Sequence, residues 1–139
     1  MDKRGISAIN QREKFTRMAL IKKDFDLEKR WGKLLDGLQQ LLGKKPSDLN
    51  AVLFIIGVQE LGSGPRNFSK EEKQDLMHIA VCRVLSQSGF YSLDFIDQDG
   101  WPHWKLEKTL PHLDAAQQEK MLKIHVLEYF EEEFEIDIK

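Results

Sequence analysis

Hydrophobic positions recur at helical spacing along most of this 139-residue chain. The clearest stripe lies in residues 24–46, where apolar residues return at steps of three and four, as on one face of a helix. Its members are Leu27, Trp31, Leu34, Leu35, Leu38, Leu41 and Leu42. Gly43 and Pro46 follow it and predict the helix end, since glycine adopts the left-handed cap conformation and proline cannot continue a helix. A weaker pattern in residues 10–23 predicts a separate helix before it.

A short apolar run forms the next segment. Residues 51–58, AVLFIIGV, are apolar on every side, and Ser47 or Asp48 precedes them as a candidate cap. The pattern predicts a helix at the centre of the bundle. A buried strand is the alternative, because Val, Phe and Ile favour sheets and so short a run fits either period.

Two later helices have recognisable starts. Ser69 with Glu72 three residues on is a capping-box pattern, which predicts a helix from there to about Gln87. The final helix is capped at or near Asp114. Its apolar face contains Met121, Leu122, Val126, Tyr129 and Phe130.

Between these two helices the hydrophobic period changes to two, as in a strand. Asp99-Gly100 is a favoured pair for a two-residue hairpin turn, because both central residues need positive φ. The turn sets a register in which the residue numbers of facing pairs add up to 199. Phe95 then faces Trp104 on the core side, and the same side includes the pair Leu93 and Leu106. Asp94 faces Lys105 on the polar side.

The predicted fold is therefore α+β and predominantly α. About five helices surround the central apolar helix, and one two-stranded antiparallel β-hairpin spans about residues 90–108. The 139 residues form one globular domain, in which a basic N-terminal helical segment, about residues 1–23, packs less tightly.

Composition limits the class of protein. With 41% hydrophobic and 32% charged residues, the chain has the balance of a soluble globular protein. Its longest apolar run is too short to cross a membrane. A lone cysteine, Cys82, excludes an intrachain disulfide and favours the cytoplasm.

The charge is unevenly distributed. Residues 1–45 hold 12 Lys/Arg against 6 Asp/Glu, and the remainder holds 9 against 17, so the halves carry +6 and −8. Such an asymmetry is typical of solvated helix faces, of two ends that attract each other within one chain or between two, or of a basic arm for nucleic acid. The candidate nucleic-acid residues are Arg12, Lys14, Arg17, Lys22 and Lys23.

Motifs that carry chemistry are weak. His78 and Cys82 are four residues apart and could ligate zinc from one helix face, but a metal site needs further ligands. The alternative is a buried thiol beside a hydrogen-bonded imidazole. The acids around Gly100 do not fit the spacing of a calcium loop, and no catalytic residues and no cofactor are predicted.

The hairpin tip is the candidate interaction site. In the predicted register Ile96, Trp101 and His103 share the outer face, where polar groups are expected. Trp101 either folds back over the helices or anchors a partner.

We therefore expect a small protein-interaction module that binds a protein partner or a second copy of itself through this tip and its complementary charged ends. The alternatives are a metal-binding protein or hydrolase-type enzyme using His, Cys and carboxylate side chains, and a nucleic-acid accessory factor using the basic N-terminal segment.

Overall fold

The computed structural model describes the backbone of residues 11–134 and 136–138 and, within these ranges, the side chains from Lys23 onward. Its elements are α2 (Gln11–Leu42), α3 (Leu49–Leu61), α4 (Lys70–Ser86), β1 (Tyr91–Ile96), β2 (Pro102–Leu106) and α5 (Ala115–Phe134). The predicted class, mostly helical α+β with one two-stranded antiparallel sheet, is confirmed. None of the helices in these ranges is long and apolar enough to span a bilayer.

Local capping fixes most helix starts where the sequence predicts them. The Asp48 carboxylate accepts from the backbone N–H of Ala51 at 2.9 Å and begins α3. At α4 both hydrogen bonds of the predicted capping box between Ser69 and Glu72 form. Asp114 accepts from the N–H of Gln117 at 2.8 Å and begins α5. Each bond satisfies a donor that the first helical turn leaves free.

The two helices predicted in residues 10–23 and 24–46 are one helix, α2, so the described chain has four helices rather than about five. The sequence on either side of the Lys23–Asp24 bond contains no glycine or proline, so nothing there ends the helix. Gly43 ends it as predicted, with φ of 78° and its N–H bonded to Gln39.

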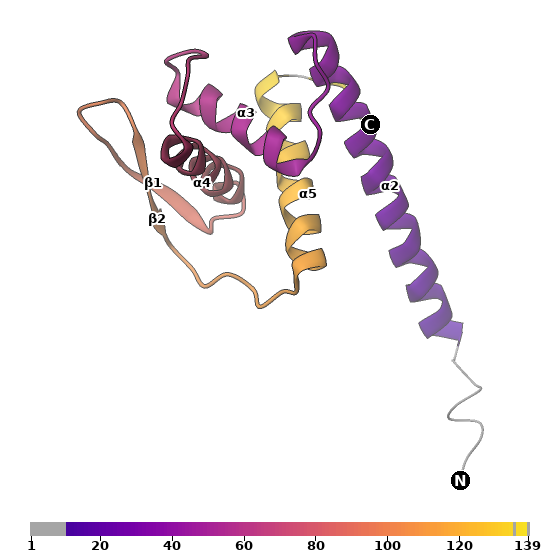
Figure 1. Ribbon diagram of the computed structural model, residues 1–139. Helices are drawn as coiled ribbons and strands as arrows, with labels where there is room; N and C mark the ends of the chain where they lie inside the picture. The colour runs from indigo at the N-terminus through magenta and orange to yellow at the C-terminus, as the bar shows by residue number, and fades with distance from the viewer. Residues whose placement is uncertain (1–10, 135, 139) are drawn as a thin grey trace.

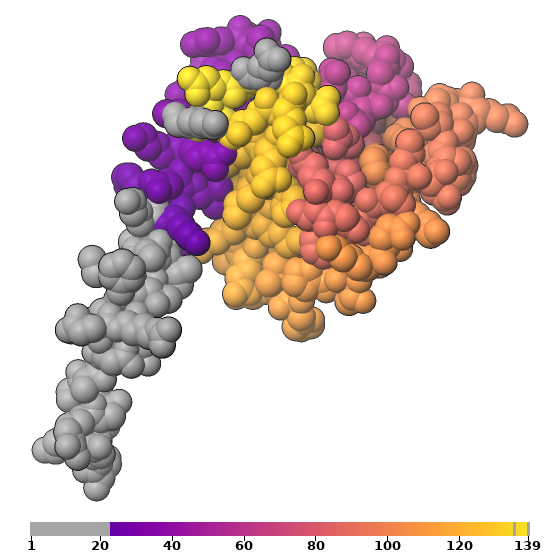
Figure 2. Space-filling view, turned by 180° about the vertical axis from the view of Figure 1, so that it is seen from behind, coloured from indigo at the N-terminus to yellow at the C-terminus, as the bar shows by residue number. Residues whose placement is uncertain are grey.

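The helices form a compact body with α5 along its middle. α2 lies beside α5 and runs in the same direction, and ion pairs between Lys120 and Asp24 and between Lys123 and Glu28 join their first halves (Figures 1 and 2). On the other side of α5, α3 crosses α4, and the hairpin packs on α4 (Figure 1). Trp31 of α2 is buried against α5, as the leucine stripe predicts.

The apolar helix α3 is buried on one side only, which differs from its predicted place at the centre of the bundle. Val52, Leu53 and Ile56 lie in the core. Gly57 lies so close to α4 that an added Cβ would be 2.2 Å from the carbonyl oxygen of Leu76. This close approach uses one side of α3, so its other apolar side is left half-exposed.

The register of the hairpin differs from the prediction. Leu93 pairs with Trp104 and Phe95 pairs with His103, with a β-bulge at Asp94 between them. The turn is not the predicted two-residue turn at Asp99-Gly100. Gly100, with φ of 87°, donates to the Asp97 carbonyl, and the N–H of Asp97 donates to Trp101. This is the bonding of a three-residue loop with a type I turn and a glycine bulge.

The predicted core face of the hairpin is correspondingly wrong in part. Trp104 is half-buried against α4, but Leu93, Phe95 and Leu106 are each about half exposed. The extra residue at the bulge moves every later side chain of β1 to the opposite face, because side chains alternate along a strand.

Candidate functional site

The acidic loop at the hairpin tip is a self-contained turn. The Asp97 carboxylate accepts from the N–H groups of Asp99 and Trp101 at 2.9 Å each and contacts His103 Nε2 at 2.9 Å. The bond from His103, together with those from the backbone, lowers the pKa of Asp97. Asp97 is therefore an anion whose oxygens fix the loop, which explains the acids and the glycine without catalysis.

The structure separates Ile96 from the other two predicted tip residues, Trp101 and His103, which line one cleft. Ile96 is 61% exposed. His103 stacks on the ring of Phe95 at 4.4 Å, on the face opposite Ile96, because the observed register places them on different sides. Trp101 is half-buried and lines a cleft against α4. Binding of a partner by these residues remains a prediction, but they do not form one patch.

The predicted metal pair lacks further ligands. Cys82 Sγ lies 3.6 Å from His78 Nε2. Within residues 23–134 and 136–138, no group of three or more His, Cys, Asp or Glu side chains is placed to hold a metal ion. Cys82 is buried, and this burial raises the pKa of its thiol to about 11, which disfavours the thiolate that metals bind.

We expect the Cys82 thiol to resist alkylation while the protein is folded. At pH 8 a pKa of about 11 leaves only about one thiol in a thousand ionised, and the side chain is fully buried. Iodoacetamide should therefore modify the native protein at least about a hundredfold more slowly than the urea-unfolded protein, followed by intact mass. Equal rates would show an accessible thiol and would return the metal-binding alternative to consideration.

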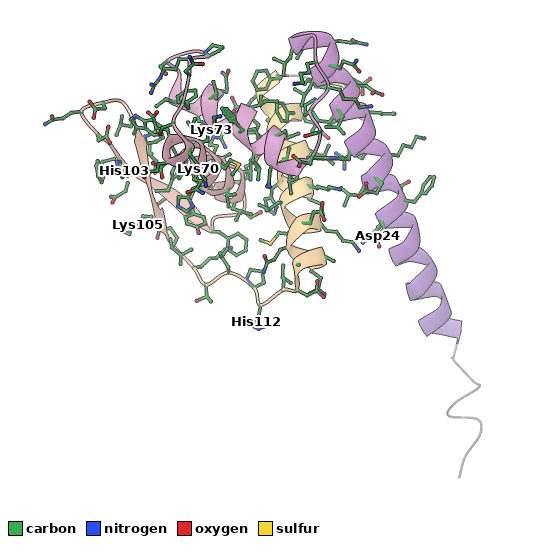
Figure 3. All side chains as sticks on the ribbon, in the orientation of Figure 1. Asp24, Lys70, Lys73, His103, Lys105 and His112 are labelled. Atoms are coloured by element: carbon green, nitrogen blue, oxygen red, sulfur yellow. The ribbon has the colours of Figure 1, made fainter. Side chains whose placement is uncertain are left out.

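The other two histidines lie elsewhere. His112 is in the exposed connection between β2 and α5, far from His103 on the hairpin (Figure 3). His125 is buried in α5, where its Nδ1 donates to the Met121 carbonyl and its Nε2 accepts from Ser88 Oγ, both at 2.7 Å. His125 therefore holds the start of the hairpin segment against α5, which is a structural role.

The basic N-terminal residues are largely beyond the described side chains. Arg12, Lys14, Arg17 and Lys22 lie outside that part, and Lys23 is exposed. The predicted contact between the basic N-terminal segment and the acidic end of α5 also falls on residues outside the described side chains.

Two described arginines do reach that acidic end. Arg30 of α2 pairs with Glu131, and Arg83 of α4 pairs with Glu133 at 2.8 Å. These pairs offset the unfavourable placement of acids at a helix C-terminus.

Arg83 also belongs to a half-buried polar cluster. It pairs with Glu60 of α3 at 3.1 Å, and the Tyr129 hydroxyl donates to the other Glu60 oxygen at 2.8 Å. Burial and then the Glu60 carboxylate raise the pKa of Tyr129, so the phenol stays protonated. The cluster ties α3, α4 and α5 together and supplies no general base.

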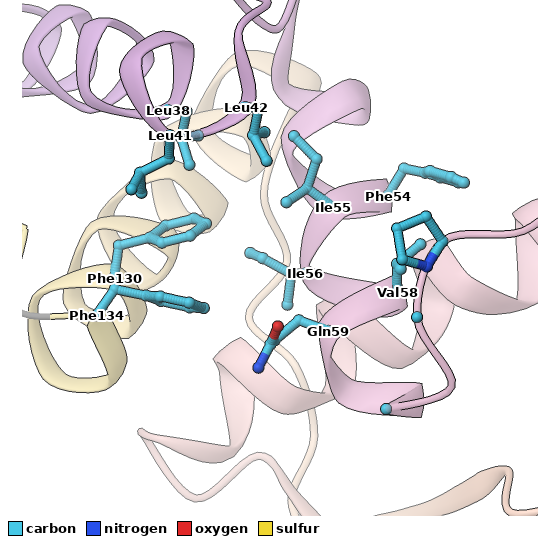
Figure 4. Close-up of a pocket in the computed structure, with 13 residues that line it drawn as sticks. Leu38, Leu41, Leu42, Phe54, Ile55, Ile56, Val58, Gln59, Phe130 and Phe134 are labelled. Atoms are coloured by element: carbon cyan, nitrogen blue, oxygen red, sulfur yellow. The ribbon is translucent and has the colours of Figure 1, made fainter.

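One concave surface of the described residues is apolar. A hollow of about 530 Å³ opens between the end of α2, one side of α3 and the end of α5, and we call it the apolar groove (Figure 4). Leu41, Phe130 and Phe134 face Ile55 and Ile56 across it (Figure 4). The described residues that line it are Leu38, Leu41, Leu42, Phe54, Ile55, Ile56, Val58, Gln59, Gly62, Gly64, Pro65, Phe130 and Phe134.

The rim of the apolar groove exposes large side chains. Leu41 is 64%, Leu42 54% and Phe134 38% exposed. Among the described residues that line the groove none is charged, and Gln59 is the polar one. Such a site can bind apolar groups.

Sequence reasoning missed the apolar groove because three distant segments build it. A signal was present in two features. The leucine stripe ends in the adjacent pair Leu41 and Leu42, which cannot both face one core, and residues 51–58 have no polar side.

Protein-family models, curated proteins and solved structures were each compared with this chain, and none of them matches it.

Proposed function

We propose that this protein is an interaction module that associates with a second copy of itself through the apolar groove. The observation that carries the proposal is an apolar wall with a hollow on each side. Leu42, Phe54 and Ile55 line both the apolar groove and a second hollow of about 450 Å³ beside Lys44–Ser47. Leu42 also projects into solvent from this wall.

A wall between two hollows suits a two-fold interface. In an isologous dimer the same patch serves both copies, so the wall of one copy fills a hollow of the other, and the reverse. Burial of exposed leucine and phenylalanine side chains supplies the free energy, at roughly 25 cal/mol per Å² of apolar surface removed from water. The described residues that line the groove carry no charge, so packing of a leucine or phenylalanine there desolvates none of their side chains as an ion. Lys44 and Lys45, which line the second hollow, are exposed.

The other predicted functions have less support. The paired His78 and Cys82 lack the additional ligands of a metal site within the described residues. The half-buried carboxylate Glu60 is already bonded to Tyr129 and Arg83. Cytoplasmic location belongs to the same proposal, since a buried reduced cysteine suits that compartment.

Analytical ultracentrifugation over a wide concentration range tests the proposal. The natural chain should approach twice its 16.2 kDa as concentration rises. Leu41→Glu should remain monomeric, because it places a charge in the interface, while its exposure in the monomer keeps the folding cost small. We expect its dimer dissociation constant to rise by at least about a hundredfold.

Leu93→Glu is the matched control, since Leu93 is a similarly exposed leucine on the hairpin. It should dimerise as the natural chain does. A monomer at all concentrations would reject the proposal and leave the apolar groove to an apolar ligand or a different protein. Loss of the dimer in Leu93→Glu but not in Leu41→Glu would reject the groove and move the interface to the hairpin, and equal loss in both variants would show that added charge, not the groove, prevents association.

A further inference from the structure

A further cleft, distinct from the apolar groove and from the hollow beside Lys44–Ser47, lies between α4 and the hairpin. Its volume is about 310 Å³. The lining residues come from α4 and from the tip region of the hairpin and are Asp75, His78, Ile79, Asp97, Trp101, Pro102, His103 and Trp104. The structure thus gathers in one place two of the predicted tip residues and one of the predicted metal pair.

Two carboxylates, those of Asp75 and Asp97, line this α4–hairpin cleft. Asp97 is kept ionised by its bonds to His103 and the loop backbone. The Asp75 side chain is exposed, and its carboxylate forms no hydrogen bond or ion pair with a described residue. Lys70 and Lys73 of α4 and Lys105 of the hairpin do not line the cleft.

Two tryptophans supply the walls. Trp101 and Trp104 are both half-buried and both line the cleft. The face of an indole ring carries negative electrostatic potential and attracts cations more strongly than any other side-chain ring. Aromatic walls beside an unpaired carboxylate are the chemistry that recognises organic ammonium and guanidinium groups.

We infer that the α4–hairpin cleft binds an organic cation, held by Asp75 and the rings of Trp101 and Trp104. The cleft volume of about 310 Å³ lies at the lower end of the range of ligand pockets, about 300–1,000 Å³, so it has room for a quaternary ammonium or guanidinium group. Such a group is carried by free small amines and by the lysine or arginine side chains of a peptide.

The cleft is largely formed before binding. The backbone N–H of Trp101 donates to the Asp97 carboxylate at 2.9 Å, and the same carboxylate bonds to the backbone N–H of Asp99 and to His103. The backbone that carries one aromatic wall is therefore fixed by the turn. Fixing the wall in advance reduces the conformational entropy lost when a ligand binds.

Titration with choline at pH 8, followed by the three indole N–H resonances in NMR spectra, tests the inference. Choline should shift the resonances of Trp101 and Trp104 and leave that of Trp31, which is buried between α2 and α5. The neutral isostere 3,3-dimethylbutan-1-ol has the same shape without the charge and should bind at least about tenfold more weakly. Shifts at equal concentrations for both compounds would overturn the cation site.

The matched variants are Asp75→Asn and Asp99→Asn. Each removes one exposed carboxylate from the same region, but Asp75 lines the cleft and Asp99 does not. Asp75→Asn should weaken choline binding by about tenfold and Asp99→Asn by less than about twofold. Equal effects would mean that only the overall field attracts the cation, and no shift with the natural chain would also reject the inference.

A comparison of choline with blocked lysine and arginine identifies whether the cation is a free amine or part of a peptide. Nα-acetyl-lysine methylamide and Nα-acetyl-arginine methylamide present the side chains of a peptide without free termini. Tighter binding of one of these than of choline would assign the site to a protein segment, and tighter binding of choline would assign it to a free amine. Because Leu41→Glu leaves this cleft unchanged, its choline affinity should equal that of the natural chain, so failure of self-association does not remove the site.

Discussion

Replacing Gly57 by alanine is expected to lower the free energy of unfolding by about 2–4 kcal/mol. An alanine Cβ at this position would lie 2.2 Å from the Leu76 carbonyl oxygen and 2.7 Å from the Leu76 carbonyl carbon. These are backbone atoms of α4, so no rotation of a side chain relieves the clash. The two helices must move apart, and the loss of packing exceeds the gain of about 1 kcal/mol that alanine has over glycine in a helix.

Gly32→Ala is the control for this substitution. Gly32 is inside α2, and apart from its chain neighbours and the nearby backbone of α2 no described atom lies within 4 Å of the position its Cβ would take. The same replacement should therefore stabilise the protein by up to about 1 kcal/mol. Urea unfolding followed by circular dichroism measures both. A stabilised Gly57→Ala variant would show that α3 and α4 are farther apart in solution.

Replacing Phe130 by alanine is expected to lower the free energy of unfolding by about 3–5 kcal/mol. Phe130 is 1% exposed, packs edge to face on Tyr129 and forms the inner wall of the apolar groove. Truncation of Phe130 to alanine removes the ring that lines the groove with residues of α2 and α3, and leaves a cavity in its place. The surrounding helices can close such a cavity only in part, because they are held by the ion pairs and caps elsewhere.

Phe134, one turn later on the same helix, gives the comparison. It also lines the apolar groove but is 38% exposed, so Phe134→Ala should cost about 1 kcal/mol or less in the monomer. A cost similar to that of Phe130→Ala at high protein concentration, and a small cost at low concentration, is expected if a second copy covers the groove. If Phe134→Ala cost as much free energy of unfolding as Phe130→Ala at every protein concentration, the groove would be closed within one chain.

The ends of the elements could be predicted because they depend on neighbours in the sequence. Ser69 and Glu72 satisfy each other's backbone within one helical turn, Asp48 and Asp114 do the same for the helices that follow them, and Gly43 adopts the left-handed conformation that ends α2. These are contacts over three or four residues, and the sequence contains all the participants.

The hairpin shows where local reasoning fails. Asp-Gly predicts a two-residue turn, but Asp97 stands two residues earlier and accepts from the N–H groups of Asp99 and Trp101. Those side-chain bonds stabilise a longer loop, and the bulge at Asp94 then changes which residues face α4. Both registers place Trp104 on the core side, and the bonds of the Asp97 side chain are the observed feature that favours the longer loop.

The sequence by itself determined the helical periodicity, the caps, the presence of one hairpin and a single buried thiol, because each follows from short-range spacing. Only the tertiary structure decided that one side of α3 packs against α4 through Gly57, which leaves the other side to form the apolar groove with α2 and α5. It likewise brought Asp75 to Trp101 and Trp104. Both sites join segments that are distant in sequence, and their geometry depends on how far apart the helices pack, which periodicity does not encode.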